Sequence, residues 1–371
     1  MGVLPPNYNF EVKKTVWKVR AAGASRVALQ FPEGLLLYAC PLADLISRFT
    51  GASCVVMGDV TYGACCVDDL GAAALGCDFL VHYGHSCLVP IDAAGAGAGA
   101  LRMLYVFVDV AFDTRHLVAS VAAAFPPGAR LALLGTIQFA PALRAAREAL
   151  LSRHPALLVP QARPLSPGEV LGCTSPDLSS AAGAPPLDAF IFVADGRFHL
   201  ESAMIRNPGV AAFRYDPYGK VLSRERYDTA GMMATRAAAV AAAAAADGTW
   251  GIVLGTLGRQ GNTALLGRLQ DALAAGGRDS VVVLMSELSF AKLAAFADVA
   301  VWVQVACPRL SIDWGAACAV PLLTPYEAHV ALGLTPWRES YPMDYYARNS
   351  GPWTNYYRPP PAATEGVKGA S

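Results

Sequence analysis

One local plan occurs three times along this chain, and it restricts the possible folds more than any other feature. A short apolar run of β-type residues is followed by a turn with Gly or Pro and then by an amphipathic helical segment. The three copies are RVALQFPEGLLLYACPLADLI (26–46), RLALLGTIQFAPALRAAREALL (130–151) and GIVLGTLGRQGNTALLGRLQDAL (251–273). Their spacing of roughly 100 residues or slightly more is the size of a small domain.

Further apolar runs follow each copy, at 54–57, 79–82, 104–108, 157–159, 190–193, 281–285 and 299–305. Near-continuous Val, Ile and Leu runs that alternate with helical segments are typical of parallel sheets covered on both faces. We therefore predict an α/β fold of three similar small α/β domains with parallel-type sheets around a pseudo-threefold centre. The expected domains are 1–115, 116–228 and 229–357, followed by a disordered tail over 358–371.

Three cysteines lie in three separate Gly-containing stretches: Cys65 in YGACCVDD, Cys173 in GEVLGCTSP and Cys307 in QVACPRLSIDWG. They come about 38, 42 and 55 residues after the first strand of their units. We expect comparable loop positions, because loops at the carboxyl ends of parallel strands carry ligands in open α/β sheets. If the domains surround a common axis, the three thiols converge.

Three thiolates at one point can hold a 4Fe-4S cluster, and since such clusters normally take four cysteines, one iron would stay open to a substrate. Two alternatives remain from the residues alone. The thiols could be unrelated core residues, or they could bind zinc together with a histidine. Cys66 could also be mistaken for the ligand in place of Cys65, although adjacent side chains generally diverge.

Composition and charge exclude several classes of function. The 371 residues contain 29 Lys and Arg and 29 Asp and Glu without any long basic block, so nonspecific nucleic-acid binding is not expected. No uncharged apolar stretch reaches the ~18 residues of a membrane helix. Nine cysteines without an apolar leader predict a reducing, cytoplasmic setting. Neither a GxGxxG loop nor a Walker A motif is present, so nucleoside triphosphate use is unsupported.

Long segments in the right order resemble subunit 1 of the diphthamide synthase family. They include PPNYNFEVKKTVWKV, ALQFPEGLLLYAC, VMGDVTYGACCVDD, DFLVHYGHSCLVPID, GEVLGCTSP, DGRFHLESAMI, LGTLGRQGN, WVQVACPRLSIDWG, PLLTPYEA and YPMDYYA. The resemblance covers roughly residues 5–357. It implies three α/β domains that each supply one cysteine, here Cys65, Cys173 and Cys307, to a 4Fe-4S cluster. Like that family, the chain lacks the CxxxCxxC triplet of ordinary radical S-adenosylmethionine enzymes.

The resemblance also implies a reaction and its partners. The reduced cluster would cleave S-adenosylmethionine, and the 3-amino-3-carboxypropyl radical would add to C2 of one histidine of translation elongation factor 2. The family works as a heterodimer with a homologous second subunit, and a small zinc-bearing protein donates electrons. The alternative within the same complex is a noncatalytic, metal-bearing scaffold or electron-transfer subunit. No direct role with nucleic acid or membrane is expected.

Other polar residues are candidates for contacts with S-adenosylmethionine. Arg309, two residues after Cys307, could bind its carboxylate. The post-strand loop with Gly255, Thr256, Arg259 and Gln260 and the loop with Asp195, Gly196, Arg197 and His199 could face the rest of the substrate. Maintenance of the fold, through turns and interdomain ion pairs, is the alternative for each of them.

Three further segments have an open interpretation. His82, His85 and Cys87 could form a second metal site, but we favour a lining role near the substrate pocket. The charged and aromatic loop 214–228 and the segment 341–353 suit either a protein interface or packing between domains.

Overall fold

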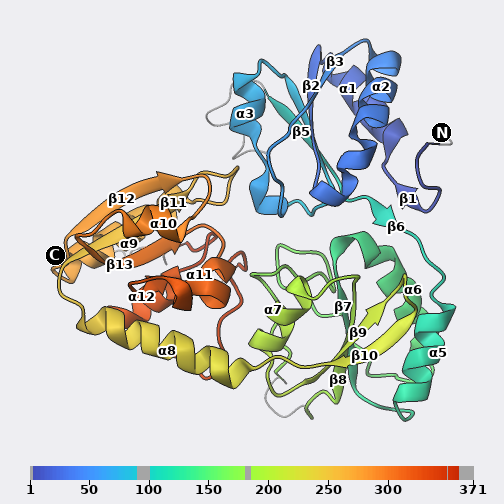
Figure 1. Cartoon of the computed structure of the whole chain (residues 1–371). Coiled ribbons are helices and arrows are strands. Elements are labelled where there is room, and N and C mark those ends of the chain that lie inside the picture. Colours follow the sequence, from blue (N-terminus) through green and yellow to red (C-terminus); the bar gives the residue numbers. More distant parts are fainter. Residues whose placement is uncertain (1–2, 90–100, 180–184, 349, 359–371) are drawn as a thin grey trace, which may run out of the picture.

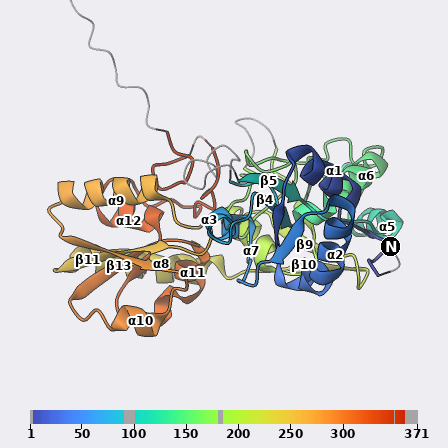
Figure 2. The ribbon, with the colours of Figure 1, turned by 90° about the horizontal axis from the view of Figure 1, so that it is seen from above.

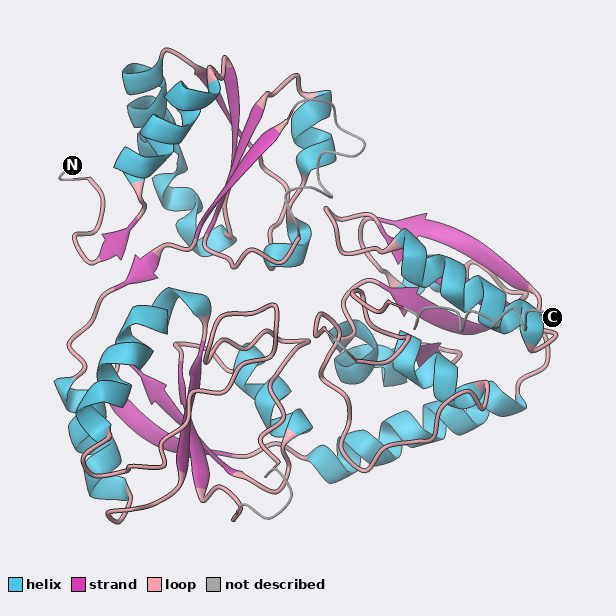
Figure 3. Cartoon of the chain, turned by 180° about the vertical axis from the view of Figure 1, so that it is seen from behind, coloured by secondary structure: helices cyan, strands magenta, loops and turns pink. Residues whose placement is uncertain are grey.

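The computed structural model describes residues 3–89, 101–179, 185–348 and 350–358. Three α/β units surround a common centre, as Figure 1 shows, and Figure 3 shows that each unit has its own sheet between helices. The predicted tail over 358–371 lies outside the described residues, apart from Arg358. None of the described helices is long and apolar enough to cross a membrane.

The first unit is a fully parallel sheet in the order β3-β2-β4-β5. Its strands are β2 (Arg26–Gln30), β3 (Ser53–Val56), β4 (Phe79–Tyr83) and β5 (Arg102–Val106). Helices α1 (Val12–Ala22) and α2 (Ala39–Thr50) pack on one face and α3 (Asp69–Ala74) on the other. Because both faces are covered, β4 is buried along its whole length.

The second unit has the order β10-β9-β8-β7. Its parallel strands are β7 (Leu131–Gly135), β8 (Ala189–Val193) and β9 (Ala211–Asp216), and β10 (Val221–Glu225) is antiparallel to β9. Helices α5 (Arg115–Ala124) and α6 (Ala140–Leu150) cover one face and α7 (Phe198–Arg206) the other. The predicted charged loop 214–228 is therefore largely a β-hairpin, and the predicted strand 157–159 is reduced to one parallel bridge, Ala132 to Leu158.

The third unit is again fully parallel, in the order β12-β11-β13-β14. Its strands are β11 (Thr249–Gly255), β12 (Ser280–Met285), β13 (Val299–Val305) and β14 (Leu322–Leu323). One face packs on α8 (Thr229–Ala245), α9 (Thr263–Ala275) and α12 (Pro325–Ala331), the other on α10 (Phe290–Ala294). Figure 2 shows α9 and α10 on opposite sides of this sheet. A capping box of Thr324 and Glu327 begins α12.

The remaining elements are short. Strands β1 (Tyr8–Asn9) and β6 (Asp109–Val110) form an antiparallel pair beside the connection between the first two units, and α11 (Arg309–Trp314) follows β13. The 3-10 turns of the described residues are η1 (Glu33–Tyr38), η2 (Ala64–Cys66), η3 (Ile137–Phe139) and η4 (Gly315–Ala317).

All three units share one strand order. When the strands of each unit are numbered along the chain, their order across the sheet is second, first, third, fourth. In the middle unit, the bridge at Leu158 takes the place of the second strand. The predicted α/β class with parallel-type sheets is thus confirmed. The domain boundaries themselves stay a prediction.

Candidate metal centre

The three cysteines lie at the ends of strands, but not in equivalent loops. Cys65 lies in η2, after the second strand of its unit, and Cys173 follows the bridge segment at the same topological place. Cys307 instead follows β13, the third strand of its unit. The expectation of comparable loop positions was therefore wrong for Cys307. A similar number of residues after the first strand contains one more strand in the third unit than in the first unit.

The three thiols nevertheless converge. The hydrogen bond with Cys66, burial, and the nearby sulfurs of Cys66, Cys307 and Cys173 raise the pKa of Cys65 well above its usual value. Burial and Cys307 raise the pKa of Cys173 to about 12, and burial raises that of Cys307 to about 11. These thiols are therefore protonated at neutral pH when no cation is bound, and a cationic metal centre would favour their thiolates.

Cys66 has a different environment from its neighbour. It is 1% exposed, its Sγ lies 3.4 Å from Nε2 of Gln260, and its carbonyl oxygen accepts a hydrogen bond of 2.8 Å from Gln30. The hydrogen bond with Cys65 lowers the pKa of Cys66 to about 7. Cys66 thus helps to hold the loop and lies near Cys307, while Cys65 lies near both Cys307 and Cys173.

The loop after β11 fixes the Cys65 turn against the third unit. The backbone N–H of Arg259 donates to the Cys65 carbonyl at 2.9 Å, and its guanidinium forms two hydrogen bonds of 2.6 and 2.7 Å to Asp69. Gly258 has a φ of +54°, and a Cβ there would clash with the backbone of Cys66. Only a glycine allows this close approach without strain.

A second arginine fixes the Cys307 loop against the middle unit. Arg309 is 3% exposed and donates to Glu201 at 2.7 Å, to the Phe198 carbonyl at 2.8 Å and to Asp313 at 2.9 Å. Its guanidinium lies 4.5 Å from the centre of the Phe198 ring. That ring in turn covers Gly172, beside Cys173.

A C-terminal segment closes the centre from another side. Tyr345 donates its backbone N–H to the Cys173 carbonyl at 3.2 Å, and Tyr346 donates to Oγ1 of Thr174 at 2.9 Å. Burial and all three cysteines raise the pKa of both tyrosines. The sequence showed only an aromatic segment, and the packing alternative for 341–353 describes what these two tyrosines do.

A cavity of about 510 Å³ adjoins the centre, and Cys307 is one of the residues that line it. Three predicted substrate-binding residues line it: Gly255, Gln260 and Arg309. Its wall is largely apolar and includes two acidic residues, Glu287 and Asp313. The other lining residues are Tyr62, Phe198, Val253, Leu257, Met285, Ser286, Glu287, Leu288, Ala306, Leu310, Asp313 and Trp314.

The other predicted contacts lie outside this lining. Thr256 is exposed, and Arg259 is paired with Asp69. Arg197 is exposed and pairs with Glu225 of the hairpin, and the Asp195 carbonyl accepts a hydrogen bond from Arg214. Gly196, in the same loop, is exposed. His199 is half-buried; burial, with Arg309, lowers its pKa to about 4. Their roles as substrate contacts stay predictions.

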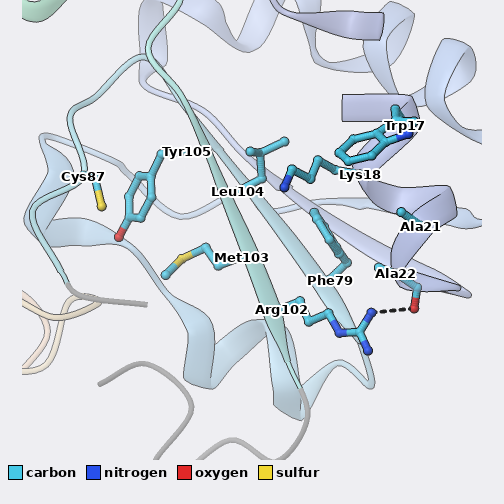
Figure 4. A pocket seen from close by; sticks show the side chains of 10 residues that line it. All are labelled: Trp17, Lys18, Ala21, Ala22, Phe79, Cys87, Arg102, Met103, Leu104 and Tyr105. Carbon is cyan, nitrogen blue, oxygen red and sulfur yellow. Dashed lines mark hydrogen bonds between the residues drawn. The ribbon is translucent and has the colours of Figure 1, made fainter. Parts of the chain in front are cut away.

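No three His, Cys, Asp or Glu side chains of the described residues gather closely enough to hold one metal ion. A 4Fe-4S cube makes a different demand, because each cysteine binds its own iron. Cys87 lines a separate cavity of about 490 Å³ between α1 and β5, where Figure 4 shows it beside Tyr105. Of the described residues that line this cavity, Cys87 alone is a candidate from the sequence, where it was predicted to lie near the substrate pocket.

Known proteins are similar to this chain in sequence and in fold. The family model described as "Putative diphthamide synthesis protein" matches residues 31–342. The 2-(3-amino-3-carboxypropyl)histidine synthase subunit 1 of Gallus gallus is 57% identical over 363 residues, which cover 98% of this chain and 86% of that protein. The protein of that name from Homo sapiens is 57% identical over 353 residues, 95% and 78% of the two chains.

A solved structure agrees with this kinship. The crystal structure of Dph2 from Pyrococcus horikoshii with a 4Fe-4S cluster superimposes with a TM-score of 0.71 and 26% identity, over 91% of this chain and 94% of that one. With the fold, the converging cysteines and these matches together, the chain belongs to the family of diphthamide synthesis proteins.

Proposed function

We propose that this chain is the iron–sulfur subunit that transfers the 3-amino-3-carboxypropyl group of S-adenosylmethionine to a histidine of translation elongation factor 2. The observation that carries the proposal is the convergence of Cys65, Cys173 and Cys307 from three units beside one cavity. The name of the relatives and the cluster in the Pyrococcus protein support it.

The donor set fits a 4Fe-4S cluster. Three thiols with raised pKa values lie near one another, and the lining of the adjoining cavity includes Cys307. When bound, the cluster would supply one electron and an open coordination position at its fourth iron. The protein would contribute position and protection from water, through the Arg259 and Arg309 contacts and the two buried tyrosines.

The cavity suits the size and charge of S-adenosylmethionine. Its volume of about 510 Å³ is in the range of small-molecule sites. The apolar wall would contact the adenosine. The carboxylates of Glu287 and Asp313 would attract the positively charged sulfonium and amino groups of the substrate. Arg309 already has three acceptors, so it would bind the carboxylate by sharing its fork with Glu201 or Asp313.

The transfer balances without a net electron. One electron enters the sulfonium as the bond from sulfur to Cγ breaks, and methylthioadenosine leaves. The carbon radical then adds to C2 of the imidazole, and loss of one electron and the C2 proton restores the aromatic ring. A homologous second subunit and a small zinc-bearing electron donor are the proposed partners, and the cytoplasm, where elongation factor 2 works, is the proposed location.

Anaerobic reconstitution with iron and sulfide, followed by reduction with dithionite and EPR spectroscopy, tests the proposal. Dithionite replaces the partner proteins, so their absence cannot explain a failure. We expect a reduced-cluster signal that S-adenosylmethionine perturbs, together with methylthioadenosine and aminocarboxypropyl fragments. Formation of 5′-deoxyadenosine would contradict the direction of cleavage. A signal indifferent to S-adenosylmethionine, without cleavage, would instead show the noncatalytic scaffold.

A further inference from the structure

A chain of hydrogen bonds starts at the Cys65–Cys66 turn and ends at a histidine. Nε2 of Gln30 donates to the Cys66 carbonyl at 2.8 Å, which fixes the orientation of its amide. Oε1 of Gln30 therefore accepts, from the Asp68 N–H at 3.2 Å and from Nδ1 of His82 at 2.8 Å. The proton of His82 must then be on Nδ1.

This tautomer determines the next one. Because Nε2 of His82 carries no proton, Nδ1 of His85 must donate to it across 3.2 Å. Burial lowers the pKa of His82 to about 3, and burial with His82 and His199 lowers that of His85 well below its usual value. His85 is thus neutral with an unprotonated Nε2, to which no described residue donates a hydrogen bond.

The loop that carries His85 lies near the candidate centre, because Leu88, three residues further on, packs in one apolar cluster with Ala64 and Cys173. His85 is the second residue after β4, as Cys307 is the second after β13, and both are third strands of their units. Helix α7, which follows β8, the third strand of the middle unit, carries His199 in its first turn, close enough to His85 to contribute to the lowered pKa of His85. Arg309 in turn affects His199 and lines the cavity. The segments that follow the three third strands therefore converge.

Two further observations show that the imidazoles lie in a prepared environment. Nδ1 of His199 is buried without a hydrogen-bond partner among the described residues. Gly84, between the two histidines, has a φ of +81°, and a Cβ there would clash with Pro32. The turn that presents His85 is thus specified by a glycine, and Nδ1 of the nearby His199 remains available to a ligand.

We propose that Nε2 of His85 accepts the C2 proton of the substrate histidine when its ring regains aromaticity, an inference that rests on the proposed function. After the radical has added, one electron returns to the oxidised iron–sulfur centre, and the C2–H bond breaks with its electron pair kept by the ring. The proton goes to His85, which becomes an imidazolium. A weak base suffices, since an oxidised ring gives up this proton readily; what matters is an unprotonated nitrogen at the right place.

The tautomer can be tested on the metal-free chain, independently of activity. With ¹⁵N-labelled histidine, long-range ¹H–¹⁵N NMR should show His85 protonated at Nδ1 and unprotonated at Nε2 from pH 6 to 8, and His85→Gln assigns the signal. Gln30→Leu removes the acceptor that fixes the proton of His82 on Nδ1, so His82 and His85 should each become a mixture of tautomers. An imidazolium, or a proton fixed on Nε2, would overturn the proposal.

The catalytic test separates cleavage from transfer. In the reconstituted His85→Gln enzyme, methylthioadenosine should form at a rate close to wild type, while modified elongation factor 2 falls by roughly 100-fold. A C2-deuterated substrate histidine should then show a primary isotope effect in the variant. His116→Gln, in the middle unit and bonded to Tyr215, is the matched control. Equal losses of both products, or unchanged transfer, would refute the role of His85. A wild-type enzyme that forms no methylthioadenosine would refute the proposed function itself, and this role with it.

Discussion

The two junctions that the third unit makes with the other two are both built on an arginine, but they differ in how many partners share it. Arg259 gives its whole fork to one carboxylate, Asp69, whose side chain is 1% exposed. Arg309 divides its donors among Glu201, Asp313 and the Phe198 carbonyl. The first junction therefore has a single ion pair beside the Arg259 N–H bond to Cys65 and the Gln260–Cys66 contact, whereas the arginine of the second junction has several acceptors.

The difference teaches how three separate units can present cysteines to one point. Each arginine lies close in the chain or in space to a cysteine: the Arg259 N–H bonds the Cys65 carbonyl, and Arg309 is two residues from Cys307. Domain closure and ligand position are thus set by the same contacts. Loss of a junction should disturb the cysteine that it holds, to a degree that depends on the remaining contacts.

The largest expected effect is loss of the cluster when one of the three cysteines is replaced. This effect should be the same at both junctions. Cys65→Ala, Cys173→Ala and Cys307→Ala should each lower iron and sulfide content after anaerobic reconstitution by more than roughly tenfold, since a cube with two protein ligands is poorly held. Cys66→Ala should retain the cluster, because this thiol bonds Gln260 and Cys65 instead. An iron-replete Cys307→Ala, or an empty Cys66→Ala, would contradict the assignment.

The next effect separates the junctions. Arg259→Met leaves Asp69 as an unpaired buried charge and should lower the free energy of unfolding by about 2–3 kcal/mol, with reduced cluster retention. Adding Asp69→Asn should recover part of that loss, as a double-mutant cycle would measure by urea unfolding. Arg197→Met is the control, because Arg197 is an exposed partner of Glu225, and should cost no more than about 1 kcal/mol. Similar losses from Arg259→Met and Arg197→Met would show that the Arg259–Asp69 pair contributes little to the free energy of unfolding.

The sheets were predictable because their strands are continuous apolar runs. The predicted run 299–305 coincides with β13, and 190–193 with most of β8. The hairpin of β9 and β10 was missed, since its alternation includes Arg214, Ser223 and Glu225 and reads as a polar loop. Leu157–Val159 has strand composition but makes only a single bridge.

The site was predictable as a set of cysteines but not as a geometry. Residue counting placed Cys307 in the wrong loop, because the second-strand loop and α10 come before β13 in its unit. The arginine partners could not be predicted either: Arg259 and Asp69 are 190 residues apart, and Arg309 and Glu201 are 108 apart. Tyr345 and Tyr346 come from beyond the last sheet, where no periodic pattern indicates a site.

The redundancy of the second junction predicts a smaller effect there. Glu201→Gln leaves Arg309 with Asp313, the Phe198 carbonyl and the Phe198 ring. We expect a loss of at most about 1 kcal/mol in urea unfolding and near wild-type iron content. A loss as large as that of Arg259→Met would mean that both junctions depend on one pair each.

The smallest effect concerns protons at the second junction. In the metal-free chain, burial and Cys307 raise the pKa of Cys173 from 9.0 to about 12, so the folded state keeps a proton that the unfolded state releases. The resulting stability is complete below pH 9 and is lost as the pH rises toward 12. Relative to Cys173→Ser, wild type should therefore show no loss of stability at pH 7, the beginning of a loss near pH 9 and a growing loss above it. Urea unfolding at several pH values measures this difference, and Cys40→Ser, which removes an exposed thiol, should not reproduce it. A pH-independent difference between wild type and Cys173→Ser would show that Cys173 is not enclosed with Cys307 before the metal arrives.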